Sequence, residues 1–170
     1  MSFALDALRS RCTAQAQVHT PLGTLLLART AQGLAGAWFE AQKHHPGELA
    51  APLRRDDALL QAAARQLSAY FAGDPALFDV PLDLQGTAFQ RSVWQVLLNI
   101  GRGATRSYGD IALQLGSPKA VRAVGAAVGR NPVSVIVPCH RVLGSSGLLT
   151  GYAGGVERKL ALLQLEGALI

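Results

Sequence analysis

The segment 107–129 constrains the fold most strongly, because its helix signals leave room for only two short helices joined by a tight turn. Ser107 opens a Ser-Tyr-Gly-Asp capping signal, which predicts a first helix of about two turns that ends at Gly116. A serine before Pro118 is a second start signal, and it predicts another helix that runs to the end of the segment. Two helices in this arrangement are typical of a helix-turn-helix.

The second predicted helix has a packing face and an open face. The apolar positions at helical spacing are expected to pack inward: Val121, Val124, Gly125 and Val128. The opposite side is basic and has little bulk, with Lys119, Arg122, Ala126 and Gly129. Such a face suits close approach to a nucleic-acid groove without reading its sequence.

Residues 1–84 have a different character and form a predicted α+β domain. Short antiparallel strands are expected at 16–20, 24–30 and 34–39. Apolar residues at helical spacing then predict a helix over 60–71. A Thr-x-x-Gln capping box begins a new helix over 87–99. We therefore place the domain boundary between residues 84 and 85, so that residues 85–170 form the second domain.

Two later elements complete the second domain. Residues 143–148 predict a hairpin-like turn between short extended pieces, and a final helix is expected from Val156 to Glu166. A helix-turn-helix followed by a hairpin makes a winged helix, so the predicted class is α+β with a winged-helix second domain. A small helical domain with a surface hairpin is the alternative.

The positive charge is concentrated in the second domain. Residues 1–84 carry 7 basic and 8 acidic side chains, whereas residues 85–170 carry 9 basic and 3 acidic ones. This imbalance indicates either a polyanion bound by the second domain or a basic surface that only keeps the protein soluble.

Signals for export, membranes and metals are lacking. No apolar run approaches the roughly 20 residues that span a bilayer, and the N-terminus does not resemble an export signal. We expect a soluble, cytoplasmic protein without a membrane partner. The two cysteines, Cys12 and Cys139, should be free thiols, and the four histidines lack metal-site spacing, so no metal or cofactor is expected.

Cys139 lies where an apolar run, residues 135–137, meets a proline, with His140 and Arg141 directly behind. A free thiol has a pKa of roughly 8.5, and neighbouring cationic or imidazole groups lower it, which favours a reactive thiolate here. An inert, buried cysteine is the alternative. In a regular strand the side chains of Cys139 and His140 would point to opposite sides, so joint action requires a turn or a bridging water.

Five motifs in order resemble those of one family, the O6-alkylguanine-DNA alkyltransferases, also called methylated-DNA-protein-cysteine methyltransferases, in their bacterial stand-alone form. Residues 138–142 match the family's Pro-Cys-His-Arg-Val active-site motif. Residues 122–125 resemble the family's arginine-finger motif, and residues 131–132 resemble its asparagine hinge. Residues 107–109 resemble its tyrosine motif, and residues 152–155 resemble its substrate loop. The resemblance extends over nearly the full chain.

The resemblance implies a ribonuclease H-like N-terminal domain and a winged-helix domain that enters the minor groove of double-stranded DNA without sequence preference. It implies irreversible transfer of an alkyl group from O6 of guanine, with O4 of thymine as a second candidate. The alkylated atom lies inside the duplex, so the base must be flipped out. Each monomer would react once without a cofactor, because a thioether has no easy leaving group.

The resemblance also assigns chemical roles. Cys139 would attack the alkyl carbon, while His140 would act on the thiol through a water and Glu166 would orient the imidazole. Asn131 would tether the segment that bears the nucleophile. Tyr108 would turn the backbone phosphate and supply a proton to the departing guanine. Glu166 lies in the last turn of the final helix, where the dipole disfavours an anion, so a cationic or imidazole partner is expected.

Binding roles are implied for further residues. Arg122 would fill the space vacated by the extruded base, and the small side chains of Ala123 and Ala126 would let the duplex approach. Main-chain groups of Cys139, Val142 and Ala153 would hold the base. Ala153 stands where many members have serine, so a hydroxyl near O6 is missing. The other implied binding residues are Arg141, Tyr152, Gly154 and Lys159, the last near the leaving group.

Three other functions are alternatives. A cysteine hydrolase would need a histidine from elsewhere in the chain and would turn over many times. A winged-helix regulator would explain the charge and the helices but not the Cys-His pair. A non-catalytic lesion binder would resemble this chain but lack its cysteine.

Overall fold

The computed structural model describes residues 3–168, and the chain divides into two compact units. The first unit extends to Gln85 and takes in Pro132–Ser134, and the second comprises Gly86–Asn131 and the chain from Val135 onward. Pro132–Ser134 belongs with the first unit because its backbone bonds to the sheet there. Ala37 N donates to the Pro132 carbonyl (2.8 Å), and Ser134 N donates to the Ala37 carbonyl (2.9 Å).

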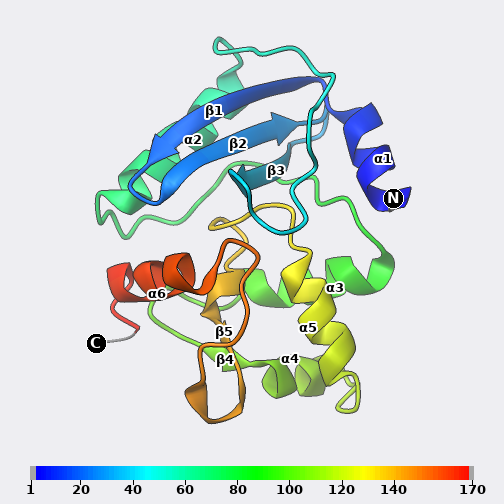
Figure 1. Cartoon of the computed structure of the whole chain (residues 1–170), viewed down its shortest axis with the longest axis vertical. Coiled ribbons are helices and arrows are strands. Elements are labelled where there is room, and N and C mark those ends of the chain that lie inside the picture. Colours follow the sequence, from blue (N-terminus) through cyan, green and yellow to red (C-terminus); the bar gives the residue numbers. More distant parts are fainter. Residues whose placement is uncertain (1–2, 169–170) are drawn as a thin grey trace. The chain divides into compact units, whose positions relative to one another are not determined.

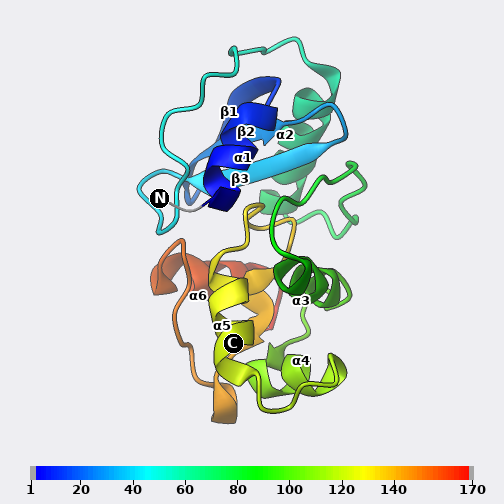
Figure 2. The same ribbon diagram turned by 90° about the vertical axis from the view of Figure 1, so that its right-hand side faces the viewer.

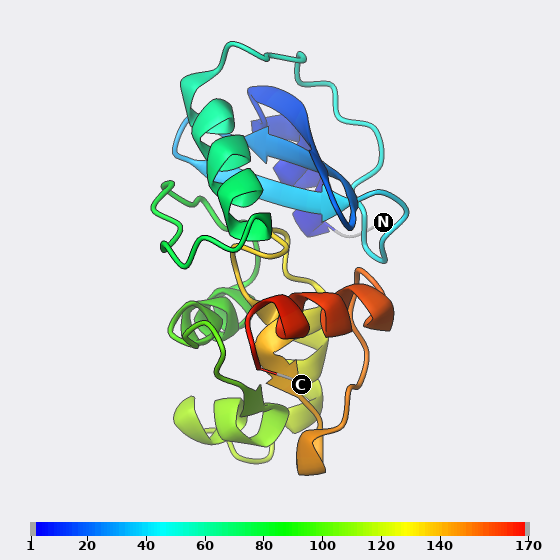
Figure 3. The same ribbon diagram turned by 90° about the vertical axis from the view of Figure 1, so that its left-hand side faces the viewer.

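The first unit is a three-stranded antiparallel sheet with a helix on each face. Its elements are α1 (Phe3–Arg11), β1 (Ala14–Thr20), β2 (Gly23–Arg29), β3 (Leu34–Phe39) and α2 (Ala58–Phe71). The strands pair in the order β1-β2-β3, which confirms the predicted strands. Figure 3 shows α2 lying across one face, and Figure 2 shows α1 on the other. Helix α1 has no counterpart in the sequence prediction.

Alternating side chains give this sheet two apolar faces. Leu27 of β2 is fully buried, and its neighbour Ala28 points to the other face, where it packs with Trp38 and with Leu8 of α1. Gly36 leaves room for the Trp38 indole, because a Cβ at position 36 would lie 1.8 Å from the ring. The strands are therefore buried from both sides.

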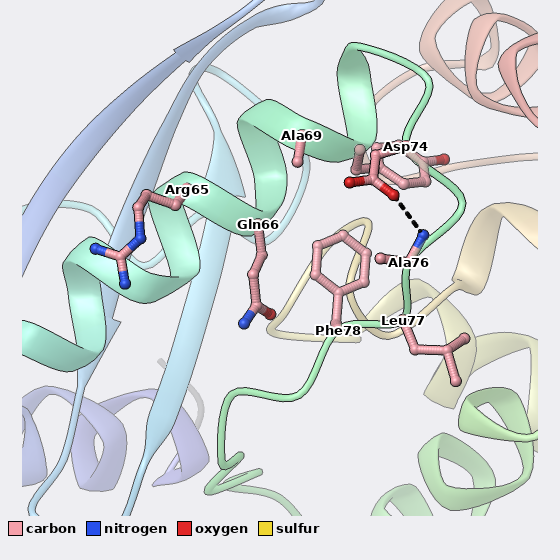
Figure 4. Close-up of a pocket in the computed structure, with 8 residues that line it drawn as sticks. Arg65, Gln66, Ala69, Asp74, Ala76, Leu77 and Phe78 are labelled. Atoms are coloured by element: carbon pink, nitrogen blue, oxygen red, sulfur yellow. Dashed lines mark hydrogen bonds between the residues drawn. The ribbon is translucent and has the colours of Figure 1, made fainter.

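A pocket of about 230 Å³ lies beside α2 and the segment that follows it (Figure 4). Asp74 accepts a hydrogen bond from the Ala76 N–H (2.8 Å), which holds that segment in a turn. The volume is smaller than the roughly 300–1,000 Å³ of typical ligand sites. The lining contains no cysteine or histidine, so we assign the pocket no catalytic role. The residues that line it are Arg65, Gln66, Ala69, Tyr70, Asp74, Ala76, Leu77 and Phe78.

The second unit consists of helices around a short strand pair. Its elements are α3 (Ala88–Leu98), β4 (Arg106–Ser107), α4 (Tyr108–Gln114), α5 (Val121–Gly129), β5 (Val142–Leu143) and α6 (Val156–Leu165). Figure 1 shows α5 and α6 on either side of the strand pair. Both capping boxes form, at Thr87 and Ser107, as predicted. The Trp94 indole N–H donates to the Ala127 carbonyl (2.8 Å) and so ties α3 to α5.

The predicted start of the second helix of the helix-turn-helix is wrong. Helix α5 begins at Val121, because residues 117–120 form a separate turn in which Ala120 N donates to the Ser117 carbonyl (2.8 Å). The expected packing of Val121 is also wrong, since this first residue of the helix is 40% exposed. Ala127, which the pattern left out, is buried instead.

The predicted hairpin-like turn over residues 143–148 is present, but it forms a loop that no further strand within residues 3–168 follows. Strand β5 pairs in parallel with β4, which comes from a distant part of the sequence. The loop itself is closed by a hydrogen bond from Gly144 N to the Leu148 carbonyl (2.9 Å). A turn of 3-10 helix at Ser145–Gly147 forms its tip.

No helix within residues 3–168 is long and apolar enough to cross a membrane. The same residues contain no cluster of three or more His, Cys, Asp or Glu side chains that could hold a metal ion.

Candidate active site

Cys139 begins a single turn of 3-10 helix, η1 (Cys139–Arg141), directly after Pro138. Val135 lies in the turn that leads into this segment and has a positive φ of 73°. A β-branched residue in this conformation costs roughly 1–3 kcal/mol, so other contacts must hold the segment in place. Because η1 is a turn, the side chains of Cys139 and His140 are not forced to opposite sides as they would be in a strand.

Asn131 holds the cysteine segment from a position just after α5. Its Nδ2 donates to the Val137 carbonyl (2.8 Å) and lies 3.1 Å from Cys139 Sγ. Asn131 and Cys139 are both buried. An amide N–H directed at the sulfur favours the thiolate over the thiol.

Burial raises the pKa of the Cys139 thiol, because a surrounding of low dielectric constant disfavours the charged form. The hydrogen bond from Asn131 and the charge of Lys159 lower this pKa, and the cysteine's own N–H and the Tyr152 hydroxyl add smaller effects in the same direction. The sequence-based expectation of a lowered pKa is therefore wrong, since it counted the neighbouring charges but not the desolvation. The thiol needs a base before it can act as a nucleophile.

His140, Glu166 and Arg141 form a buried array. His140 Nε2 lies 2.7 Å from Glu166 Oε1. Arg141 binds the same carboxylate at two points, with Nε 2.9 Å from Oε2 and Nη2 2.7 Å from Oε1. Its Nη1 donates to the Ile100 carbonyl. Glu166 thus has both an imidazole and a cationic partner at the end of α6, as its position in the sequence predicts.

Burial favours the neutral form of the His140 imidazole, and one of its ring nitrogens has no hydrogen-bond partner within residues 3–168. Burial lowers its pKa, while the hydrogen bond and the charge of Glu166 raise it less. The neutral ring therefore donates its Nε2 hydrogen to Glu166. Its Nδ1 is buried and has no hydrogen-bond partner within residues 3–168. A buried, unoccupied ring nitrogen of this kind can accept a proton.

Lys159 of α6 is fully buried. Its Nζ donates to the Thr150 carbonyl (2.8 Å) and lies 3.4 Å from the Gly151 carbonyl. Burial lowers the pKa of Lys159 to about 8, although the charge of Cys139 works against this shift. The lysine therefore ties down the residues before the loop 152–155, and its positive charge favours the Cys139 thiolate.

The residues that the resemblance implies to hold the flipped base lie in two segments, one at β5 and the other in the loop before α6. Val142 starts β5, and its N–H donates to the Cys139 carbonyl. Tyr152 and Ala153 are half-buried in the loop before α6. Gly154 is buried, and its carbonyl accepts a hydrogen bond from Arg158 (2.9 Å).

The remaining predicted residues form a second group, on α4 and α5. Tyr108 is the first residue of α4, and its ring lies against α5 at Gly125, where a Cβ would be 3.8 Å from the Tyr108 Cδ1. Arg122, Ala123 and Ala126 are all exposed on α5. This face presents one arginine among very small side chains, as the helical spacing predicts.

Sequence reasoning missed the main-chain groups that position these side chains. The carbonyl of Ile100 holds Arg141, and those of Thr150 and Gly151 hold Lys159. Every residue has a carbonyl, so no sequence pattern marks these three. The burial of Trp94, which ties α3 to α5, could have been predicted, because a large aromatic residue within a helix usually faces the core.

Comparison with known proteins extends this picture. Residues 88–168 match the family model of the DNA-binding domain of 6-O-methylguanine DNA methyltransferase. Residues 15–84 match that of the ribonuclease-like domain of 6-O-methylguanine DNA methyltransferase. A methylated-DNA–protein-cysteine methyltransferase of Mycobacterium bovis is 50% identical over 149 residues, which cover 88% of this chain and 89% of the relative. One from Methanosarcina acetivorans is 48% identical over 150 residues, covering 88% and 96%.

The fold of this chain is also similar to those of solved structures. The crystal structure of Mycobacterium tuberculosis O6-methylguanine methyltransferase superimposes with a TM-score of 0.82 at 48% identity, covering 91% of this chain and 93% of that one. The structure of Mycobacterium tuberculosis OGT in complex with DNA gives the same TM-score, identity and coverage.

Proposed function

The chain belongs to the 6-O-methylguanine DNA methyltransferase family, and we propose that Cys139 is the residue that receives the alkyl group. The family gives the activity: the chain is an enzyme of the methylated-DNA–protein-cysteine methyltransferase type that binds DNA and repairs it by direct reversal. One observation carries the assignment of Cys139. Its buried Sγ lies 3.1 Å from Asn131 Nδ2, and the next residue is a neutral His140 whose Nδ1 has no partner within residues 3–168.

In the proposed reaction His140 is the base that activates the thiol. Its Nδ1 takes the thiol proton through a water, and Glu166 stabilises the resulting imidazolium through the 2.7 Å contact with Nε2. The sulfur then attacks the alkyl carbon in line, so that a C–S bond forms as the C–O6 bond breaks. The electron pair of the broken bond stays on guanine, and Tyr108 is the proposed proton donor to the departing base.

Three side chains stabilise the negative charge on sulfur before the attack. Asn131 does so by its 3.1 Å contact with the sulfur, Lys159 does so through its charge, and the Tyr152 hydroxyl adds a smaller effect in the same direction. A hydrogen bond to a charged group contributes about 1.5–3 kcal/mol, which is enough to offset part of the cost of burying the thiolate. These groups therefore make attack by a buried sulfur feasible.

Arg122 and Tyr108 are the proposed base-flipping residues. Arg122 is exposed on α5 between small neighbours, so it can enter the base stack while Ala123 and Ala126 allow the duplex to come close. This face lacks the array of polar side chains that reads base edges in the major groove. We therefore propose minor-groove binding without sequence preference, as expected for a protein that searches for lesions. The basic excess of residues 85–170, our proposed DNA-binding domain, attracts the phosphates.

The flipped base would be held mainly by main-chain groups. Val142 and Ala153 are the proposed contacts, with the loop around Gly154 closing the site. Ala153 provides no hydroxyl, so recognition of O6 falls to its N–H. A site that depends on main-chain donors can also accept O4 of thymine, which we propose as a second substrate atom.

A thioether on Cys139 has no easy leaving group, so each protein molecule is proposed to react only once. We also propose that the protein acts as a monomer and without a cofactor. A cytoplasmic location stays a prediction from the sequence. A lesion binder without catalysis, or a winged-helix regulator, would give no reason for the buried Cys139, His140 and Glu166 array. Those alternatives are therefore not favoured.

Arg122 can be tested by comparing two substrates, O6-methylguanine in a duplex and the free O6-methylguanine base. If Arg122 contributes about 1.4 kcal/mol to base extrusion, R122A transfers the methyl group from duplex about tenfold more slowly and from the free base at the wild-type rate. R130A, which removes an exposed arginine just after α5, is the matched control. An equal loss on both substrates would contradict the flipping role.

A further inference from the structure

All three nitrogens of the Arg141 guanidinium bind groups inside the protein. Its Nε and Nη2 bind the two oxygens of Glu166 at 2.9 and 2.7 Å, and its Nη1 binds the Ile100 carbonyl. The side chain is 11% exposed, and that of Glu166 is not exposed at all. This engagement points to a role for Arg141 within the active site rather than on DNA.

Arg141 and His140 share one carboxylate oxygen. Both His140 Nε2 and Arg141 Nη2 lie 2.7 Å from Glu166 Oε1. A carboxylate that faced the imidazole alone would favour the imidazolium as its ion-pair partner. Here the guanidinium already neutralises the carboxylate, so a second proton on His140 would place a net positive charge among fully buried side chains.

We propose that Arg141 is a positioning residue for the transfer: by clamping Glu166, it keeps His140 neutral, with its hydrogen on Nε2 and Nδ1 open to the thiol proton. This inference rests on the proposed function, because it requires Cys139 and His140 to act as nucleophile and base.

The other charged groups around His140 do not replace this role. Glu166 and Lys159 face the imidazole from α6, and Arg141 faces it from η1. Helix α3 also packs against η1, but its one charged side chain, Arg91, is exposed. The Lys159 ammonium donates to main-chain carbonyls. Arg141 is thus the cation that holds the carboxylate.

The direction of the expected effect does not depend on which atom keeps the last proton. Cys139 and His140 titrate as a coupled pair, and the reactive form has one proton fewer than the inactive acidic form. A nearby positive charge favours loss of that proton. Removing Arg141 therefore moves the acidic limb of the rate profile to higher pH, by about 1–3 units if a neighbouring charge acts with its usual strength.

The test is the single-turnover rate of methyl transfer from an O6-methylguanine duplex between about pH 5 and about pH 9, where the acidic limb reports the essential base. In R141M we expect the limb to move up by about one unit or more. R141K keeps the charge, so its limb should stay near that of wild type. R102M is the matched control, because Arg102 donates to the main-chain carbonyl of Leu165 at the same end of α6 (3.4 Å).

Nitrogen-15 NMR of histidine-labelled protein reports the protonation state and tautomer of His140 directly. It can be measured on the wild-type protein, without a destabilised variant. We expect wild-type His140, assigned with H140Q, to be neutral at pH 7 with its hydrogen on Nε2. An imidazolium, or a hydrogen on Nδ1, would overturn the proposal even if R141M did not fold. A folded R141M with an unmoved limb, or an equal shift in R102M, would also overturn it. Failure of wild type to transfer any methyl group to Cys139 would instead reject the proposed function.

Discussion

Asn131 makes the contact on which the reactivity of the thiol depends most directly, so its replacement by alanine gives a sharp prediction. The substitution removes the donor to the Val137 carbonyl (2.8 Å) and to Cys139 Sγ (3.1 Å). Each buried acceptor that loses its donor costs about 1–3 kcal/mol, and sulfur is a weak acceptor, so N131A should destabilise the protein by about 2–4 kcal/mol.

The same substitution should raise the pKa of the Cys139 thiol further. A hydrogen bond to a charged group is worth about 1.5–3 kcal/mol, which corresponds to about one to two pKa units. Below the thiol pKa the single-turnover rate should therefore fall by about 10- to 100-fold, and the loss should shrink as the pH rises. The rate from an O6-methylguanine duplex, measured across pH, checks this expectation.

The matched control is N99A, because Asn99 also donates through Nδ2 to a carbonyl, that of Gln95 (3.1 Å), but is exposed. It should change stability by no more than about 0.5 kcal/mol and leave the rate unchanged. The reasoning is refuted if N131A is destabilised as predicted but transfers the methyl group at the wild-type rate at every pH.

Three further predictions concern the array, the buried lysine and the sheet. E166Q leaves the cation of Arg141 without its buried partner, so it should lower the free energy of unfolding by about 3–5 kcal/mol in denaturant titrations; a loss below 1 kcal/mol would be inconsistent with a buried pair. The folded-state pKa of Lys159 is lowered from 10.5 to about 8, so wild type should gain stability relative to K159M as the pH rises between those values; a constant difference would argue against the buried ammonium. G36A brings a Cβ to 1.8 Å from the Trp38 ring and should cost about 1–3 kcal/mol by thermal unfolding, whereas an unchanged melting temperature would mean that the indole can move aside.

The local signals of the sequence predicted the local structure well. The capping boxes at Thr87 and Ser107 involve residues three positions apart, so their partners are present in the sequence itself. The serine before Pro118 gave a wrong helix start, because the Ser117 carbonyl closes a turn with Ala120 instead. A start signal shows that a helix can begin at a residue, but tertiary packing decides whether it does.

The electrostatics of the site depend on contacts and burial that the sequence does not contain. The residues alone predicted only a cationic or imidazole partner for Glu166, and it was the family resemblance that named His140. Their contact joins residues 26 positions apart, so only the fold can bring them together. The pKa of Cys139 was expected to be lowered, because adjacent residues are visible in the sequence. Desolvation, which raises it, depends on every element packed around the sulfur.

The central claim is that Cys139 takes the alkyl group and keeps it. Its most direct test is the mass of the intact protein and of its cysteine peptides after incubation with an excess of O6-methylguanine duplex. We predict a gain of one methylene per protein molecule, located on the peptide with Cys139 and absent from the one with Cys12, and no further repair once the protein is consumed. Repaired DNA together with unmodified Cys139 would contradict the account.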